Sequence, residues 1–158
     1  MTPCIFCGIV RGQAPATIVY EDDELLAFLD IRPITRGHTL VIPKRHATDL
    51  AELPPDTGAA MLRAGQLLAA AMRGSDLRSD GTNLVLNDGR AAFQTVGHVH
   101  LHVIPRRTGD LRGFITGLVL RRNTDPVGTG AAIRAGLRRT AGSSPITDTD
   151  RSESGEPA

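Results

Sequence analysis

The sequence predicts an α+β protein, in which an antiparallel sheet of about five strands is covered by one long helix. Short apolar runs end at glycine, proline or acidic turns, as strands do. A single Ala-, Leu- and Met-rich segment, the expected helix, lies between the third and the fourth run. Such a helix can cover one face of the sheet, which leaves the other face for a site or a partner subunit.

The expected strands follow from their residue types and their turns. "TIVYEDD" and "ELLAFLD" are β-prone runs around an acidic turn, which predicts a hairpin over residues 17–30. "GHTLVIPK" is the third strand, which opens at Gly37 and ends at Pro43. "GTNLVLNDG" is the fourth strand, with a turn at residues 87–89, and "HVHLHVIP" is the fifth.

The expected long helix covers residues 54–74. Met61, Leu68 and Met72 fall on one side at helical spacing, and Gly74 suits the C-terminal end. Nearer the C-terminus, "GTGAAIRAGLRR" favours a further short helix. The sequence therefore predicts one helix that packs on the sheet and a second one beyond it.

Composition and charge limit the class of protein. Apolar residues make up 41% and charged residues 22%, with a formal net charge of +1, which is typical of a soluble globular protein without a field for nucleic acid. No apolar run approaches the length that spans a bilayer, and the N-terminus lacks the basic start and long apolar stretch of a signal peptide. We therefore expect a cytoplasmic protein without a nucleic-acid or membrane partner.

Three segments are expected along the chain of 158 residues, which has room for one domain with a core. They are a main domain over residues 1–107, an Arg-rich extension packed on it over 108–142, and a disordered tail over 143–158. We expect the chain to fold when it is cut after Arg107, and we expect removal of the tail after Ser143 to change nothing.

Three of the five histidines alternate with aliphatic residues in "QTVGHVHLHVIPRR", residues 94–107. Successive side chains of a strand point to opposite faces, so His98, His100 and His102 share one face. Three interpretations are open: ordinary strand positions, a three-histidine metal site, or nucleophilic catalysis on phosphorus. A neutral imidazole is a good nucleophile near neutral pH, and a phosphorylated ring nitrogen is readily hydrolysed.

Two long segments extend this motif: "CIFCGIVRGQAPATIVYEDDELLAFLDIRPITRGHTLVIPKRH" and "NLVLNDGRAAFQTVGHVHLHVIPRR". With the three histidines they resemble the histidine triad (HIT) family, in its nucleotide-binding (Hint-like) branch and the bacterial type with an N-terminal CxxC. The resemblance covers residues 4–107, which would then be the catalytic domain. It implies a homodimeric nucleotidyl hydrolase or transferase that acts at the α-phosphate of a nucleoside phosphate conjugate, of the purine nucleoside phosphoramidate type.

The resemblance also implies catalytic roles for four histidines. His100 would attack the α-phosphorus and form a nucleotidyl-histidine intermediate that water then cleaves. His102 would contact the phosphate, and His98 completes the triad. His38 matches the family's additional histidine and would support the triad from an adjacent strand.

Seven further residues match nucleotide-binding positions of the family. Asp30 would bond the ribose hydroxyls, because a carboxylate accepts two hydrogen bonds. Asn87 and Thr95 would donate to phosphate oxygens, and Gln94 would reach the leaving-group side. The implied walls of the base pocket, which without the resemblance would be assigned to the core, are Phe6, Phe28 and Ile31.

Two other functions stay open. The triad segment also resembles the fragile-histidine-triad branch, which implies a dinucleoside polyphosphate hydrolase or phosphorylase. A nucleotide-binding scaffold without relevant turnover would use the same pocket. If the Arg-rich segment is more than a solvated surface, Arg106 or Arg107 is expected to contact the distal phosphates of a polyphosphate substrate.

Cys4 and Cys7 are the two cysteines of the chain, and their spacing suits a metal or redox pair better than a structural disulfide. Free thiols are the third possibility. A zinc ion needs two further ligands, which the resemblance supplies as His46 and His98. Four protein ligands leave no open position for a substrate, so the expected zinc is structural.

Overall fold

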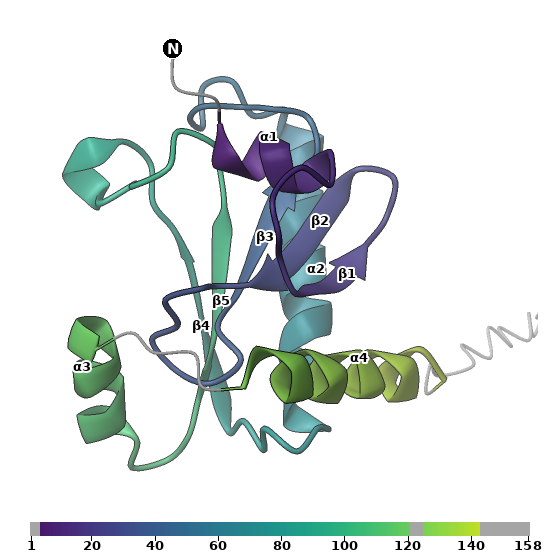
Figure 1. Cartoon of the computed structure of the whole chain (residues 1–158), viewed down its shortest axis with the longest axis vertical. Coiled ribbons are helices and arrows are strands. Elements are labelled where there is room, and N and C mark those ends of the chain that lie inside the picture. Colours follow the sequence, from purple (N-terminus) through teal and green to yellow (C-terminus); the bar gives the residue numbers. More distant parts are fainter. Residues whose placement is uncertain (1–3, 121–124, 143–158) are drawn as a thin grey trace, which may run out of the picture.

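The computed structural model describes residues 4–120 and 125–142 (Figure 1), so the expected tail at 143–158 lies outside the described residues. Within them, five strands form one antiparallel sheet in the order β1-β2-β3-β5-β4. Their bounds are β1 (Ile18–Glu21), β2 (Leu25–Leu29), β3 (Thr39–Pro43), β4 (Gly81–Leu86) and β5 (Leu101–Arg106). The α+β class and the predicted strands are confirmed.

The register of the central strands decides which side chains share a face. Every residue of β2 and β3 is buried, because both strands have neighbours on either side and both faces are covered. Leu40 of β3 pairs with His102 of β5, and Val41 pairs with Leu101. Paired residues lie on the same face of a sheet, so His102 is on the Leu40 face and Leu101 is on the Val41 face.

The Val41 face packs against α2 (Pro55–Arg73), the long helix that the sequence predicts. α4 (Pro126–Gly142) packs against α2 and β1, and it crosses in front of α2 in Figure 1. Gly136 permits this close crossing, because an added Cβ atom would lie 2.2 Å from the carbonyl oxygen of Ala71. Ile133 of α4 is fully buried in the same core cluster. A cut after Arg107 would remove Ile133 from this core, so its position argues against the expectation that the shortened chain folds.

The Leu40 face is covered by α1 (Ile5–Val10), a short helix that the sequence pattern does not predict. Phe6 and Ile9 of α1 pack on Phe28, Leu40 and other apolar residues of β2 and β3. With six residues, α1 is too short to be stable alone. Its packing on the sheet therefore explains why it forms.

A second unpredicted helix, α3 (Leu111–Leu120), follows β5. Arg106 at the end of β5 forms an ion pair with Asp110 at 2.6 Å, donates to Asn83, and lies 3.8 Å from the ring centroid of Phe114. Arg107 donates to the carbonyl oxygen of Leu77. Both arginines thus have structural partners at the base of α3.

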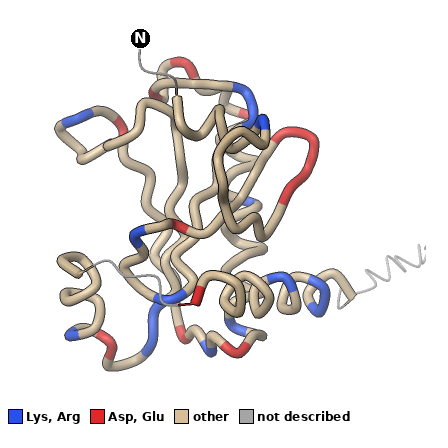
Figure 2. The backbone as a smooth tube through the Cα atoms, in the orientation of Figure 1, with Lys and Arg blue, Asp and Glu red and all other residues tan. Residues whose placement is uncertain are grey.

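Charges of both signs are distributed over the described surface. Figure 2 shows Lys and Arg on α4 and between β5 and α3, and Asp and Glu at the turn between β1 and β2. Among the described residues, no helix is long and apolar enough to cross a membrane.

Candidate functional site

The segment before and within β5 places the three alternating histidines. The strand begins only at Leu101, so His98 and His100 lie in the stretch that leads into it. The expected alternation is nevertheless present, because Val99, Leu101 and Val103 belong to the core cluster on the α2 side. The histidines therefore lie on the side that faces α1.

His100 is held in one orientation by its neighbours. Its Nδ1 lies 2.8 Å from the carbonyl oxygen of His98, and a carbonyl oxygen can only accept a hydrogen bond. Nδ1 therefore carries the hydrogen, and in the neutral ring the lone pair is on Nε2. The ring is 3% exposed and meets the edges of Phe6 and His102 at centroid distances of 5.4 and 4.8 Å. His100 is thus an oriented imidazole with a nucleophilic nitrogen.

His38 and His102 form a chain of hydrogen bonds beside His100. The backbone N–H of Ile34 donates to Nδ1 of His38 at 3.2 Å, so the hydrogen of the neutral His38 ring is on Nε2. Nε2 then donates to Nδ1 of His102 at 2.9 Å, which leaves the hydrogen of neutral His102 on its own Nε2. Asp30 lies next to this chain, with its Oδ2 3.6 Å from Nδ1 of His38. The arrangement fixes His102 as a donor at Nε2.

The residues predicted to line the base pocket have different surroundings. Phe6 and Phe28 are 7% and 3% exposed and meet edge to face at 5.4 Å, within the cluster between α1 and the sheet. Ile31 is 80% exposed in the loop after β2. Asp30, just before it, accepts a hydrogen bond from the backbone N–H of Arg32. The structure thus brings Phe6 to His100, while Ile31 faces outward.

The loop between β4 and β5 carries the predicted phosphate-side residues. Gln94 uses its side chain within the protein: Oε1 accepts from the backbone N–H of Gly89, and Nε2 donates to the carbonyl oxygen of Thr48, both at 2.7 Å. Thr95 is exposed and Asn87 is half-buried. Gln94 therefore shapes the loop that presents Thr95.

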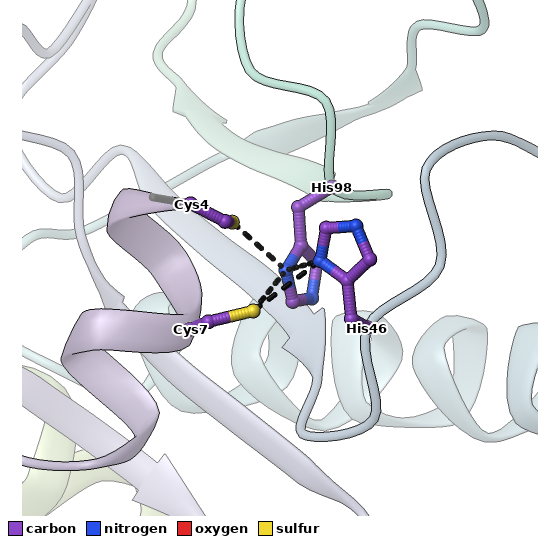
Figure 3. Close-up of side chains that lie close together, drawn as sticks. All are labelled: Cys4, Cys7, His46 and His98. Atoms are coloured by element: carbon purple, nitrogen blue, oxygen red, sulfur yellow. Dashed lines mark hydrogen bonds between the residues drawn. The ribbon is translucent and has the colours of Figure 1, made fainter. Parts of the chain in front are cut away.

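The two cysteines meet two histidines at the N-terminal end of α1 (Figure 3). Cys4 and Cys7 come from the start and the first turn of α1, His46 follows β3, and His98 precedes β5. Their four ligand atoms lie within 4.8 Å of one another. The structure thus brings together all four residues of the predicted zinc site, although they are far apart in the sequence.

The cluster has the dimensions of a tetrahedral zinc site. Nδ1 of His98 lies 3.2 Å from Nδ1 of His46, 3.5 Å from Sγ of Cys4 and 3.6 Å from Sγ of Cys7. Ordinary zinc bond lengths require about 3.3 Å between two nitrogens and about 3.6 Å between nitrogen and sulfur. The separations around His98 therefore match those of a tetrahedral zinc site, and the four residues form a cluster able to bind zinc.

Protonation also fits a metal at this cluster. Nε2 of His98 lies 2.9 Å from the carbonyl oxygen of Pro43 and donates to it, so Nδ1 presents its lone pair to the cluster. Burial is the main cause that lowers the pKa of His98, which keeps the ring neutral. Burial and the neighbouring Cys4 raise the pKa of the Cys7 thiol, so a bound cation is needed to hold the sulfurs as thiolates.

Comparisons with known proteins match well over half of this chain. The model of the HIT domain matches residues 11–109. A HIT-like protein of Mycobacterium tuberculosis is 54% identical over 135 residues, which are 85% of this chain and 93% of that protein. An adenylylsulfatase of Arabidopsis thaliana is 44% identical over 107 residues, or 68% of this chain and 54% of that protein.

A solved structure matches the fold over most of the chain. It is a zinc-bound histidine triad family protein from Mycobacterium smegmatis, with a TM-score of 0.83 and 52% identity, and the match covers 89% of this chain and 97% of that one. Zinc in that relative agrees with the Cys/His cluster found here.

Proposed function

Because this chain belongs to the histidine triad family, we propose that it is a nucleotide-binding hydrolase or transferase that acts at the α-phosphate of a nucleoside phosphate conjugate. The preferred substrate class is a purine nucleoside phosphoramidate. The single observation that carries the proposal is the hydrogen bond from Nδ1 of His100 to the carbonyl oxygen of His98, which directs the lone pair of a buried imidazole to Nε2. The Arabidopsis relative is an adenylylsulfatase, which supports chemistry on an adenylyl group.

In the first step, the lone pair on Nε2 of His100 forms a bond to the α-phosphorus. The bond from phosphorus to the leaving nitrogen or oxygen breaks, and the leaving atom keeps that electron pair and takes up a proton from water. Nε2–H of His102 donates to a phosphoryl oxygen, where it stabilises the charge that develops in the transition state. The hydrogen-bond chain from Ile34 through His38 supports this donor role.

In the second step, a water oxygen attacks the phosphorus of the nucleotidyl-histidine. The bond between phosphorus and Nε2 breaks, the lone pair returns to His100, and the proton of the water goes to solvent. The products are the free leaving group and a nucleoside monophosphate. No external base is needed, because the hydrogen of the neutral ring is on Nδ1 and the lone pair on Nε2 is free to attack.

The substrate contacts are proposals as well. Asp30 accepts from the ribose hydroxyls, and Asn87 and Thr95 donate to phosphate oxygens. Phe6 and Phe28 support the base and Ile31 covers it from the loop. The purine preference and a homodimeric assembly belong to the same proposal.

Zinc has a structural role in the proposed function. Four protein ligands leave no coordination position for a substrate, so the bound ion would link α1, the loop after β3 and the stretch before β5. The residues that hold it are Cys4, Cys7, His46 and His98.

Replacement of the nucleophile tests the function. His100→Ala and His100→Gly should reduce hydrolysis of adenosine phosphoramidate by at least about 1,000-fold, while adenosine monophosphate still binds. Wild-type activity of these variants on every phosphoramidate and dinucleoside polyphosphate that the native protein hydrolyses would reject His100 as the nucleophile. A native protein that binds these nucleotides but turns over none of them would instead be a scaffold.

A further inference from the structure

Phe93 has a backbone conformation that its residue type disfavours. Its φ angle is +64°, in the left-handed region that glycine or asparagine usually occupies. A bulky side chain at such a position is an outlier, and outliers of this kind cluster at functional sites. The fold does not need the ring there, because Phe93 is 83% exposed.

The other three phenylalanines of the chain pack against neighbouring side chains. Of the four, which all lie in the described ranges, Phe6 and Phe28 are buried and Phe114 lies under the guanidinium of Arg106. Phe93 alone presents most of its ring to solvent. Scattered exposed apolar residues are ordinary, so the ring would carry no argument without the conformation and the surroundings described next.

Hydrogen bonds hold the turn that presents the ring. The backbone N–H of Phe93 donates to the carbonyl oxygen of Arg90, and that of Gln94 donates to the carbonyl oxygen of Gly89, both at 3.1 Å. The side chain of Gln94 ties the turn to Gly89 and to Thr48. The ring is therefore presented by an ordered backbone, so a ligand would not have to order this turn on binding.

The ring borders a groove that reaches the proposed phosphate site. The groove has a volume of about 690 Å³ and is lined by Thr48, Asp49, Arg90, Phe93, Gln94 and Thr95, among others. Thr95 is the residue proposed to donate to the phosphate, and Arg90 is a cationic residue that lines the same groove as Phe93. An aromatic ring and an arginine on one groove are the residue types that planar groups and nucleotides recognise.

The order of the strands decides which half of the substrate this groove would take. The proposed nucleoside contacts, Asp30, Phe6 and Phe28, come from α1 and from β2 and the residue that follows it, on the β3 side of β5. Phe93 lies in the loop between β4 and β5, directly after the turn at residues 90–92, and Figure 1 shows this turn projecting from the sheet away from α1. A substrate whose phosphate is at the triad would therefore point its leaving group toward Phe93.

We propose that Phe93 determines leaving-group specificity by stacking on a planar aromatic ring of the leaving group, such as the base of a second nucleotide or the ring of an aromatic amine. This inference rests on the proposed function and defines the substrate's distal half. Phe93 is not a group that performs chemistry, because its ring has neither a proton to donate nor a lone pair. Its effect is on the binding of one half of the substrate.

Three conjugates of adenosine monophosphate test the proposal, with tryptamine, propylamine or a second adenylate as the leaving group. Phe93→Gly and Phe93→Asn suit the left-handed turn, so their Tm should equal or exceed that of the native protein. Both should lower kcat/KM by about tenfold for the tryptamine and adenylate conjugates and leave the propylamine conjugate within about twofold. Phe93→Trp should keep the native preference. A loss with adenylate alone would identify a nucleotide as the source of the ring, and a loss with tryptamine alone would identify an aromatic amine.

Two results would overturn the proposal. One is a ratio of rates between the aromatic and propylamine conjugates that is the same in the Gly variant and the native protein. The other is an equal loss with all three conjugates together with a changed sedimentation coefficient, which would assign Phe93 to a subunit contact. If the native protein hydrolyses none of them, the proposed function fails, and the affinities of the same conjugates by calorimetry decide the Phe93 question separately.

Discussion

His98 links the two clusters: its carbonyl oxygen accepts the hydrogen bond of His100 at 2.8 Å, while its own Nδ1 lies 3.5 Å from Sγ of Cys4. The side chain is fully buried, and its remaining nitrogen is engaged with the carbonyl oxygen of Pro43. One residue therefore belongs to the metal site and also orients the proposed nucleophile. Loss of the metal or of one of its ligands should therefore change the orientation of His100, because the main chain of His98 joins the two sites.

Loss of the metal is the first test of this link. Cys7→Ser, or treatment with a chelator, should lower kcat by about tenfold and change KM less, because the orientation of His100 loosens while the nucleotide contacts remain. The Tm should fall in parallel, and added zinc should restore both in the chelated native protein. An unchanged kcat in protein that is shown by elemental analysis to be free of metal would contradict the link.

Replacement of His38 tests the hydrogen-bond chain. His38→Ala removes the donor to Nδ1 of His102, so the hydrogen of His102 is no longer fixed on Nε2. We expect kcat to fall on the order of 100-fold, with the affinity for adenosine monophosphate nearly unchanged. The ring of His38 is 1% exposed, so the Tm must be measured alongside. If the variant loses activity and folded protein in the same proportion, its folded fraction keeps full specific activity. His38 would then have only a structural role.

The contribution of α4 to the core is testable by a pair of substitutions on one helix. Ile133→Ala should cost about 2–5 kcal/mol in the free energy of unfolding, because it opens a cavity in the main core. Val127→Ala is the matched control, since Val127 is 74% exposed on the same helix, and it should cost less than about 0.5 kcal/mol. Urea unfolding measures both. Equal small costs would show that α4 is dispensable.

Tyr20 and Asp22 make stability depend on pH at the β1–β2 turn. Tyr20 donates to Oδ2 of Asp22 at 2.6 Å, and this bond raises the pKa of Tyr20 to about 12. Burial alone would raise the pKa of Asp22, but the bonds from Tyr20 and from the backbone N–H groups of Leu25 and Glu24 lower it below 3.8. Both shifts favour the pair of a neutral phenol and a carboxylate in the folded state.

Tyr20→Phe should therefore cost about 1 kcal/mol at neutral pH. A lowered carboxyl pKa contributes stability that is present above 3.8 and is lost as pH falls through the folded value. A raised phenol pKa contributes stability that is present below 10 and is lost as pH rises toward about 12. The difference between native and variant in urea unfolding should shrink at both ends. A difference that is constant from acid to alkaline pH would refute the pairing.

Hydrophobic periodicity and turn residues predicted the elements that the local sequence determines, namely the five strands and the long helix α2. Alternation fixed the two faces of the triad segment, and the spacing of Met61, Leu68 and Met72 identified the face of α2 that is buried. The spacing of Cys4 and Cys7 suggested a metal or redox pair, but the two histidine ligands were predicted from resemblance alone, because ligands as distant as Cys4 and His98 have no periodic signal. Tertiary packing made the rest unpredictable. α1 is too short to have a helical pattern, and α3 is anchored by Arg106, whose partners lie on two other segments.

Phe93 was also missed, although a signal was present. It stands in "GRAAFQTV", where a polar loop between two strands would ordinarily have a small or polar residue at a left-handed position. The residue type alone does not reveal a φ angle, so only the structure joins the conformation to the exposure. Gln94, which the resemblance assigns to the leaving-group side, also bonds the turn that carries Phe93.

Trapping the covalent intermediate proposed on His100 distinguishes nucleophilic catalysis from direct hydrolysis. Rapid acid-free quenching of the native protein with an adenosine phosphoramidate, followed by peptide mass spectrometry, should find an adenylyl group on His100 and none in His100→Gly. Hydrolysis of a substrate chiral at phosphorus should proceed with retention of configuration, since each of two displacements inverts the centre. An adenylyl group on another residue, or inversion at phosphorus, would contradict the account.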